Sequence, residues 1–202
     1  SKEPMIETPG LSVKAISYNK TVIGDAVVKS RWDTETRGIT LAAAISQEGG
    51  RSSFVDGAIY PLNDSLDITF TVDHANVGFM RPYMEAFASD ISGRASGRAR
   101  IFGTFKQIDL EGDVCAHDLR LKINFTNTYY AASDSVHFRP GLIDLDGIRI
   151  KDSEGHTARL NGWLRHEFFK NPTFEFSVTG ARNFLSYNET ARDNPLWYGK
   201  IY

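Results

Sequence analysis

Five histidines and one cysteine are the side chains of this sequence best suited to nucleophilic or metal chemistry. The histidines are His74, His117, His137, His156 and His166. None forms the helix-spaced pair that holds a metal ion, and His117 and Asp118, like His166 and Glu167, are neighbours that would point to opposite faces of a strand. Cys115 cannot form an internal disulfide and lies within a strand-like pattern. We interpret the histidines as ordinary surface or structural residues and Cys115 as inert.

Acidic and glycine-containing motifs do not indicate a catalytic site either. Asp144 to Gly147 resembles the start of a calcium loop, but Ile148, Arg149 and Ile150 follow in strand alternation instead of supplying the remaining ligands. No Gly-x-Ser-x-Gly elbow and no phosphate-binding loop occurs, and nothing singles out two carboxylates as a glycosidase pair. We expect no enzymatic activity, no bound metal and no cofactor.

Arg94, Arg98 and Arg100 form the one notable basic cluster, and strand alternation would place all three on one face. They would serve either as a contact for an anionic head group or partner, or as a solvated strand face with neighbouring acids. The formal net charge of the chain is −2. Because this balance offers no basic excess for a phosphate backbone, we expect no nucleic-acid partner.

The elements that would position these side chains follow from a period of two. Apolar residues alternate with polar ones in four runs. These are Ile39, Leu41, Ala43 and Ile45; Leu66, Ile68, Phe70 and Val72; Leu119, Leu121, Ile123 and Phe125; and Phe174, Phe176 and Val178. Since successive strand residues point to opposite faces, each run gives one apolar and one wet face, which is typical of antiparallel sheets.

Turn residues separate these runs at short intervals and predict a meander of about a dozen strands. The turns are Glu48–Gly50, Pro61–Asp64, Asp152–Gly155 and Lys170–Pro172. Two segments depart from the alternation. Residues 77–88 have helical apolar spacing, with Pro82 tolerable in a first turn, and residues 181–187 are a weaker counterpart. The sequence therefore predicts an all-β fold with one or two short helices.

A weak repeat of about 50 residues runs through the chain, in the form apolar-x-Gly-x-apolar. Its glycines are Gly57, Gly112 and Gly162. Glycine within a strand often marks a bend or bulge, so these positions favour a curved sheet. We treat residues 1–202 as a single β-rich fragment of a larger protein, since the first residues lack a signal peptide's apolar core and the last seven, from Leu196 to Tyr202, read as strand.

An apolar sheet face of this size needs a covering layer. Either the sheet packs on itself as a sandwich or barrel, or it curls into a trough whose interior is filled by another molecule. Acyl chains would gain about 0.8 kcal/mol per buried methylene in such a trough. The alternation alone leaves both outcomes open.

Three segments in this order resemble the TamB family, which belongs to the wider AsmA-like group. The first is residues 91–103, a Gly-x3-Gly-x5-Gly run after the predicted helix. The second is residues 148–169, a strand, an Asp-x-x-Gly turn and a Leu-x-Gly strand. The third, residues 184–190 and 193–202, is similar to the corresponding region of TamB-like proteins of the Bacteroidetes. The resemblance covers residues 55–202, without the family's membrane anchor or C-terminal domain.

The resemblance implies an elongated, mostly antiparallel sheet curled into a taco-like trough in the periplasm, within a full-length protein anchored in the inner membrane. It implies phospholipid transport or outer-membrane protein assembly, with phospholipid acyl chains and an outer-membrane assembly protein of the TamA or BamA type as partners. The expected groove lining is Leu66, Ile68, Phe70, Val72, Leu119, Leu121, Ile123, Phe125, Phe174, Phe176 and Val178. The alternative is a scaffold that binds a partner by β-strand addition, without lipid.

Overall fold

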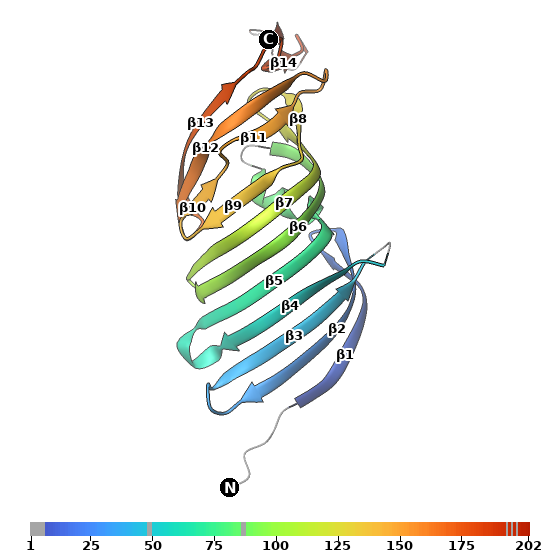
Figure 1. The fold of residues 1–202 in the computed structure, drawn as a ribbon, viewed down its shortest axis with the longest axis vertical. Helices are drawn as coiled ribbons and strands as arrows, with labels where there is room; N and C mark the ends of the chain where they lie inside the picture. Colours follow the sequence, from blue (N-terminus) through green and yellow to red (C-terminus); the bar gives the residue numbers. More distant parts are fainter. Residues whose placement is uncertain (1–6, 48–49, 86–87, 193, 195, 197) are drawn as a thin grey trace.

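The fold is an all-β, curved and elongated antiparallel sheet, as the alternation predicts (Figure 1). The computed structural model describes residues 7–47, 50–85, 88–192, 194, 196 and 198–202. Its strands are β1 (Glu7–Tyr18), β2 (Thr21–Asp33), β3 (Gly38–Ser46), β4 (Ser52–Tyr60), β5 (Ser65–Asn76), β6 (Ala88–Thr104), β7 (Gln107–Ile123), β8 (Thr128–Ala132), β9 (Ser135–Arg139), β10 (Leu142–Asp144), β11 (Ile148–Lys151), β12 (Thr157–Glu167), β13 (Lys170–Thr179), β14 (Tyr187–Glu189) and β15 (Gly199–Ile201). The predicted turn residues 48–49 lie outside the described residues, as do residues 86–87 of the predicted helix.

The first thirteen strands form one sheet with a meander topology. Each strand from β1 to β7 pairs with the next, and β12 pairs with β13. Between β7 and β12, two strand positions are each occupied by two short strands. β8 and β9 both pair with β7, while β10 and β11 both pair with β12. The sheet is therefore a simple up-and-down ribbon with two interrupted strands, and β14 and β15 form a separate hairpin.

Polar groups replace the strand ladder where β8–β9 and β10–β11 are interrupted. The Asp134 carbonyl accepts from the Ala116 N–H at 2.9 Å, and its carboxylate accepts from the Arg149 N–H at 3.3 Å. The Asn161 side chain accepts from the Gly147 N–H at 3.1 Å. These bonds satisfy backbone groups that would otherwise be left without partners, so the sheet continues across both gaps.

Strand bulges give the sheet its curl. β5, β6 and β7 each carry a register shift near the same ends of the strands, and His74 and Asp118 adopt positive φ there. A bulge bends its strand and increases the local twist. In Figure 1 these strand ends, on the right, curl away from the viewer. The curl brings the β1–β2 turn to the segment after β5, where the Asn19 amide donates to the Phe79 carbonyl at 2.9 Å.

Of the two predicted helices, the first is much shorter than expected and the second does not form. Residues 77–84 form a 3-10 turn, η2 (Val77–Met80), followed by one α-helical turn, α1 (Arg81–Met84). Ala88 already pairs with Ile123 as the first residue of β6, and this pairing limits the helix. The prediction of a helix over residues 181–187 is wrong, because that segment begins with a turn, in which the Phe184 N–H donates to the Ala181 carbonyl, and Tyr187 begins β14. A 3-10 turn, η1 (Pro61–Asn63), lies in the predicted turn before β5.

Gly57 and Gly162, two of the repeat glycines, lie where only glycine fits. Their φ angles are +155° and +149°. A Cβ on Gly57 would lie 2.1 Å from the Asp67 carbonyl oxygen, and one on Gly162 would lie 2.0 Å from that of Glu175. Both glycines let a neighbouring strand approach closely at the concave face, where side chains converge.

Candidate functional site: the inner face

The sheet has two chemically different faces, which strand register defines. Directly opposed residues in an antiparallel pair point to the same side. Ile68 faces Gly57 on β4 and Ile101 on β6, and Phe70 faces Val55 and Ala99. We call the face that carries these residues the inner face and the opposite one the outer face. Leu66 and Val72 extend the inner row along β5, so the four β5 residues predicted from the sequence lie together.

β7 continues the inner face, although its last predicted residue does not belong to it. Leu119, Leu121 and Ile123 lie on the inner face opposite Ala132, Tyr130 and Thr128. The bulge at Asp118 keeps these residues in phase with the earlier part of the strand. The placement of Phe125 in this strand is wrong. β7 ends at Ile123, and Phe125 lies in the following turn with 88% of its surface exposed.

β13 carries the third predicted set at the edge of the sheet. Phe174 faces Leu164, Phe176 faces Gly162 and Val178 faces Leu160, all on the inner face. These side chains are 65%, 43% and 45% exposed. The Phe174 and Phe176 rings stack with centroids 5.2 Å apart. The inner face thus reaches the sheet edge with its apolar character intact.

Several inner-face residues were missing from the prediction. They are Ile59, Ile101, Leu110, Phe138, Ile143 and Leu164. On β6 the positions between the arginines hold alanine and glycine, so the sequence shows no clear alternation of large apolar and polar residues there. On β9 and β10 the strands are too short to show alternation. On β4 the alternation was present in the sequence and could have predicted Ile59, because Val55 and Ile59 lie two positions before and after Gly57.

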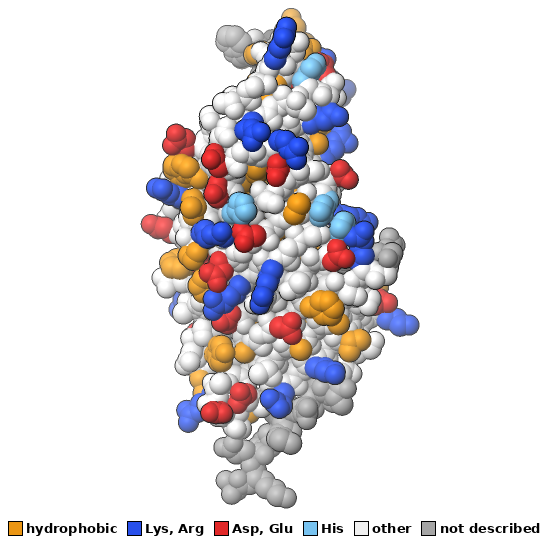
Figure 2. Space-filling model, in the orientation of Figure 1, with side chains coloured by type: hydrophobic (Ala, Val, Ile, Leu, Met, Phe, Trp, Pro, Cys, Tyr) orange, Lys and Arg blue, Asp and Glu red, His pale blue; other side chains and the backbone are white. Residues whose placement is uncertain are grey.

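The inner face is concave and the outer face convex. Val55, Ile91, Ala116 and Ile148 on the inner face are buried. By contrast, Val27 and Phe54 on the outer face are each 48% exposed. Side chains converge on the inside of a curved sheet and splay on the outside, which accounts for the difference. Figure 2 shows the convex face, where Lys and Arg lie among Asp and Glu, with hydrophobic side chains scattered between them.

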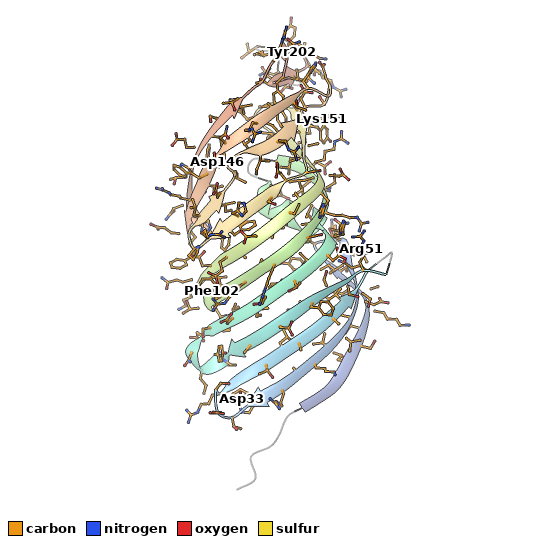
Figure 3. All side chains as sticks on the ribbon, in the orientation of Figure 1. Asp33, Arg51, Phe102, Asp146, Lys151 and Tyr202 are labelled. Atoms are coloured by element: carbon orange, nitrogen blue, oxygen red, sulfur yellow. The ribbon has the colours of Figure 1, made fainter. Side chains whose placement is uncertain are left out.

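A C-terminal segment, residues 181–189, covers one end of the inner face. Phe184 and Leu185 are 2% and 1% exposed, and the Phe184 ring stacks on Tyr130 at 5.5 Å. The Tyr130 hydroxyl donates to the Leu185 carbonyl at 3.3 Å. We call this segment the cap. Tyr202, which follows it, and Lys151 both lie near this end of the molecule (Figure 3).

Asp152 anchors the cap, a role that sequence reasoning missed. Its buried carboxylate accepts from the Leu185 N–H at 2.7 Å and from the Glu154 and His156 N–H groups at 2.9 and 2.8 Å. Burial alone would raise the pKa of Asp152, but these hydrogen bonds outweigh it and hold the pKa below its usual value. The Asp-x-x-Gly turn was visible in the sequence, but the contact with Leu185 was not.

The arginine cluster lies on the outer face, and acids lie beside Arg98 and Arg100. Arg100 pairs with Asp67 at 2.7 Å and with Glu111 at 2.9 Å, and these bonds raise its pKa and lower that of Asp67. Arg94 donates to the His74 carbonyl at 3.3 Å, and Arg98 faces Asp113. Of the two interpretations, the solvated strand face with neighbouring acids accounts for these contacts.

His74, His117, His137 and Cys115 lie on the outer face, whereas His156 lies in the turn beside Asp152 and His166 is buried. The His74 and His117 rings stack with centroids 4.3 Å apart, and the Ser96 hydroxyl lies 2.9 Å from His117 Nε2. This cluster ties the bulges of β5 and β7 across β6. Cys115 is partly buried and faces Ser96. Arg51 and Asp33 mark opposite ends of the strands (Figure 3).

The Asp144–Gly147 segment, which resembles the start of a calcium loop, has a structural role here. The Asp144 carboxylate accepts from the Asp146 N–H at 2.9 Å. In the part of the chain that the structure describes, no group of three or more His, Cys, Asp or Glu side chains is placed to hold a metal ion. Likewise, no helix among those residues has the length and apolar content to cross a membrane.

Comparison with protein-family models, curated proteins and solved structures found no match to this chain. Its function must therefore be inferred from its own residues. Of the two faces that strand register defines, the inner face is the one that carries the apolar rows of β5, β7 and β13.

Proposed function

We propose that this chain is a periplasmic segment of a TamB-like envelope protein and that its inner face binds phospholipid acyl chains. The observation that supports this proposal is the row of apolar side chains that crosses the concave face from β3 to β13. Leu66, Ile68, Phe70 and Val72 in this row are only partly buried, and contiguous apolar surface that stays partly exposed is typical of binding sites. The acyl chain is the ligand whose shape and polarity match a long apolar strip.

Along β5 and β6 the described side chains of the inner face are apolar. Along β5 its members are Leu66, Ile68, Phe70 and Val72, and their partners on β6 are Gly103, Ile101, Ala99 and Gly97. Such a lining stabilises methylene groups in proportion to the area that they bury and discriminates little along the strip. Such a lining suits an acyl chain that slides along the strip, in keeping with a role in phospholipid transport. We propose no catalytic step.

Binding of the fluorescent fatty acid cis-parinaric acid to delipidated protein tests the proposal. We expect saturable binding. Phe70→Asp should lower the affinity about tenfold or more, because it places a charge between Val55 and Ala99 on the inner face. Thr71→Asp is the matched control, since Thr71 is the next residue and points outward. It should leave the affinity unchanged.

Thermal unfolding of both variants separates a binding defect from a folding defect. Absence of saturable binding to the folded wild-type chain would exclude the acyl-chain function. Equal loss of affinity in both variants would show that the probe does not bind specifically to the inner face. Capture of extended peptides without lipid binding would favour the alternative, a scaffold that adds a partner strand at a sheet edge.

A further inference from the structure

The two edge strands of the sheet differ in their capacity to pair. An edge strand presents unpaired N–H and C=O groups that can template another strand. β1 is irregular: its pairing with β2 shifts register between Thr8 and Leu11 and again between Val13 and Ile16, and Ala15 adopts a φ of +51°. Bulges of this kind protect an edge from pairing.

β13 has none of this protection over most of its length. From Thr173 to Thr179 it pairs with β12 in unbroken register. Every residue of β13 is exposed, and β12 is its one partner strand in the described part of the chain. Of the two edge strands of this sheet, β13 is thus the regular one available for pairing.

The side chains of β13 decide what could pair with it. Phe174, Phe176 and Val178 occupy its inner face, and Glu175 is the one charged residue between Thr173 and Thr179. A matching strand must offer apolar residues at alternate positions and no acid opposite Glu175. β13 itself meets both conditions when it is reversed about Phe176.

We propose that β13 is a self-association edge, through which a second copy of this chain pairs antiparallel about a two-fold axis at Phe176. In this register Phe174 faces Val178 of the second copy, Glu175 faces Ser177, and Thr173 faces Thr179. Each apolar side chain has an apolar partner. Moving the axis to Glu175 would place two carboxylates opposite each other, and moving it to Ser177 would place Phe174 opposite Gly180.

The symmetry makes this association closed. Because the large sheet of each copy offers one regular edge, a two-fold pairing uses the β13 edge of both copies and leaves none of these edges for a third copy. A two-fold axis perpendicular to the sheet keeps both inner faces on the same side, so the apolar strip continues from one copy into the next. The inference goes beyond the acyl-chain proposal and does not depend on it.

Cysteine cross-linking in a Cys115→Ser background tests the register. Phe176→Cys lies on the two-fold axis and should give a disulfide-linked dimer under mild oxidation with copper–phenanthroline. Glu175→Cys is the matched control, since its opposite residue is Ser177 and the second copy of residue 175 lies two residue pairs further along the ladder. It should cross-link far less.

Sedimentation velocity of the uncross-linked protein tests the association itself. The wild-type chain should be a dimer in the micromolar range, and Phe176→Asp should be a monomer. Phe125→Asp, at an exposed phenylalanine outside β13, should stay dimeric. A wild-type monomer throughout this range overturns the proposal, as does equal cross-linking through positions 175 and 176.

Discussion

Replacing Asp152 by alanine is expected to destabilise the folded chain by about 3 kcal/mol. The carboxylate accepts three backbone N–H groups, and one of them belongs to Leu185, which is 1% exposed. Alanine would leave that N–H buried without a partner, and the cap would separate from Tyr130. Urea unfolding monitored by circular dichroism measures the loss.

Asp144→Ala provides the control for this prediction. Its carboxylate accepts from the exposed Asp146 N–H, which water can solvate, so the expected loss is about 1 kcal/mol. Equal destabilisation by the two substitutions would contradict the role of Asp152 as the anchor of the cap.

The contribution of Asp152 should also depend on pH. The pKa of Asp152 is lower in the folded chain than its ordinary value of 3.8. Its stabilising contribution is therefore fully present above about pH 4 and is lost as the pH falls through the folded-state pKa. The difference in unfolding free energy between the wild-type chain and Asp152→Ala should be constant near neutral pH and should shrink in acid.

Gly57→Ala is expected to cost about 3 kcal/mol or more. A φ of +155° is strained for any L side chain, and the new Cβ would lie 2.1 Å from the Asp67 carbonyl oxygen. β4 is paired on both sides, with β3 and with β5, so it cannot move away from either neighbour. Thermal and urea unfolding measure the cost.

Gly180→Ala separates the steric effect from the backbone effect. Gly180 has a φ of +66°, but nothing lies within 4 Å of the position of its Cβ. It should cost about 1–2 kcal/mol. A Gly57→Ala variant as stable as Gly180→Ala would show that β4 and β5 do not approach as closely as described.

The inner face was largely predictable because its signal is local. Alternation along a single strand placed Ile68, Phe70, Leu121 and Phe176 on an apolar face, and strand register confirms that they share it. The limit of the signal appears at Phe125, where the alternation continued into a turn. Alternation along one strand does not show where that strand ends, because its end lies where hydrogen bonding to the neighbouring strand stops.

The curl and the cap depend on contacts that no local pattern encodes. Asp152 and Leu185 are far apart in the chain, and nothing near either residue indicates that one binds the other. The bulges likewise have no local signal, because His74 and Asp118 are residues of ordinary type that adopt unusual backbone conformations. The repeat glycines were the one sign of curvature in the sequence, because a glycine within a strand indicates a bend or a close approach of the neighbouring strand.

Site-specific photo-cross-linking tests acyl-chain binding to the inner face most directly. Benzoylphenylalanine would replace Ile68 on the inner face or its neighbour Thr69 on the outer face, and each variant would be irradiated with phosphatidylethanolamine vesicles. We expect covalent lipid adducts from position 68 and almost none from position 69. Adducts formed equally at both positions, or at position 69 alone, would contradict the proposed function.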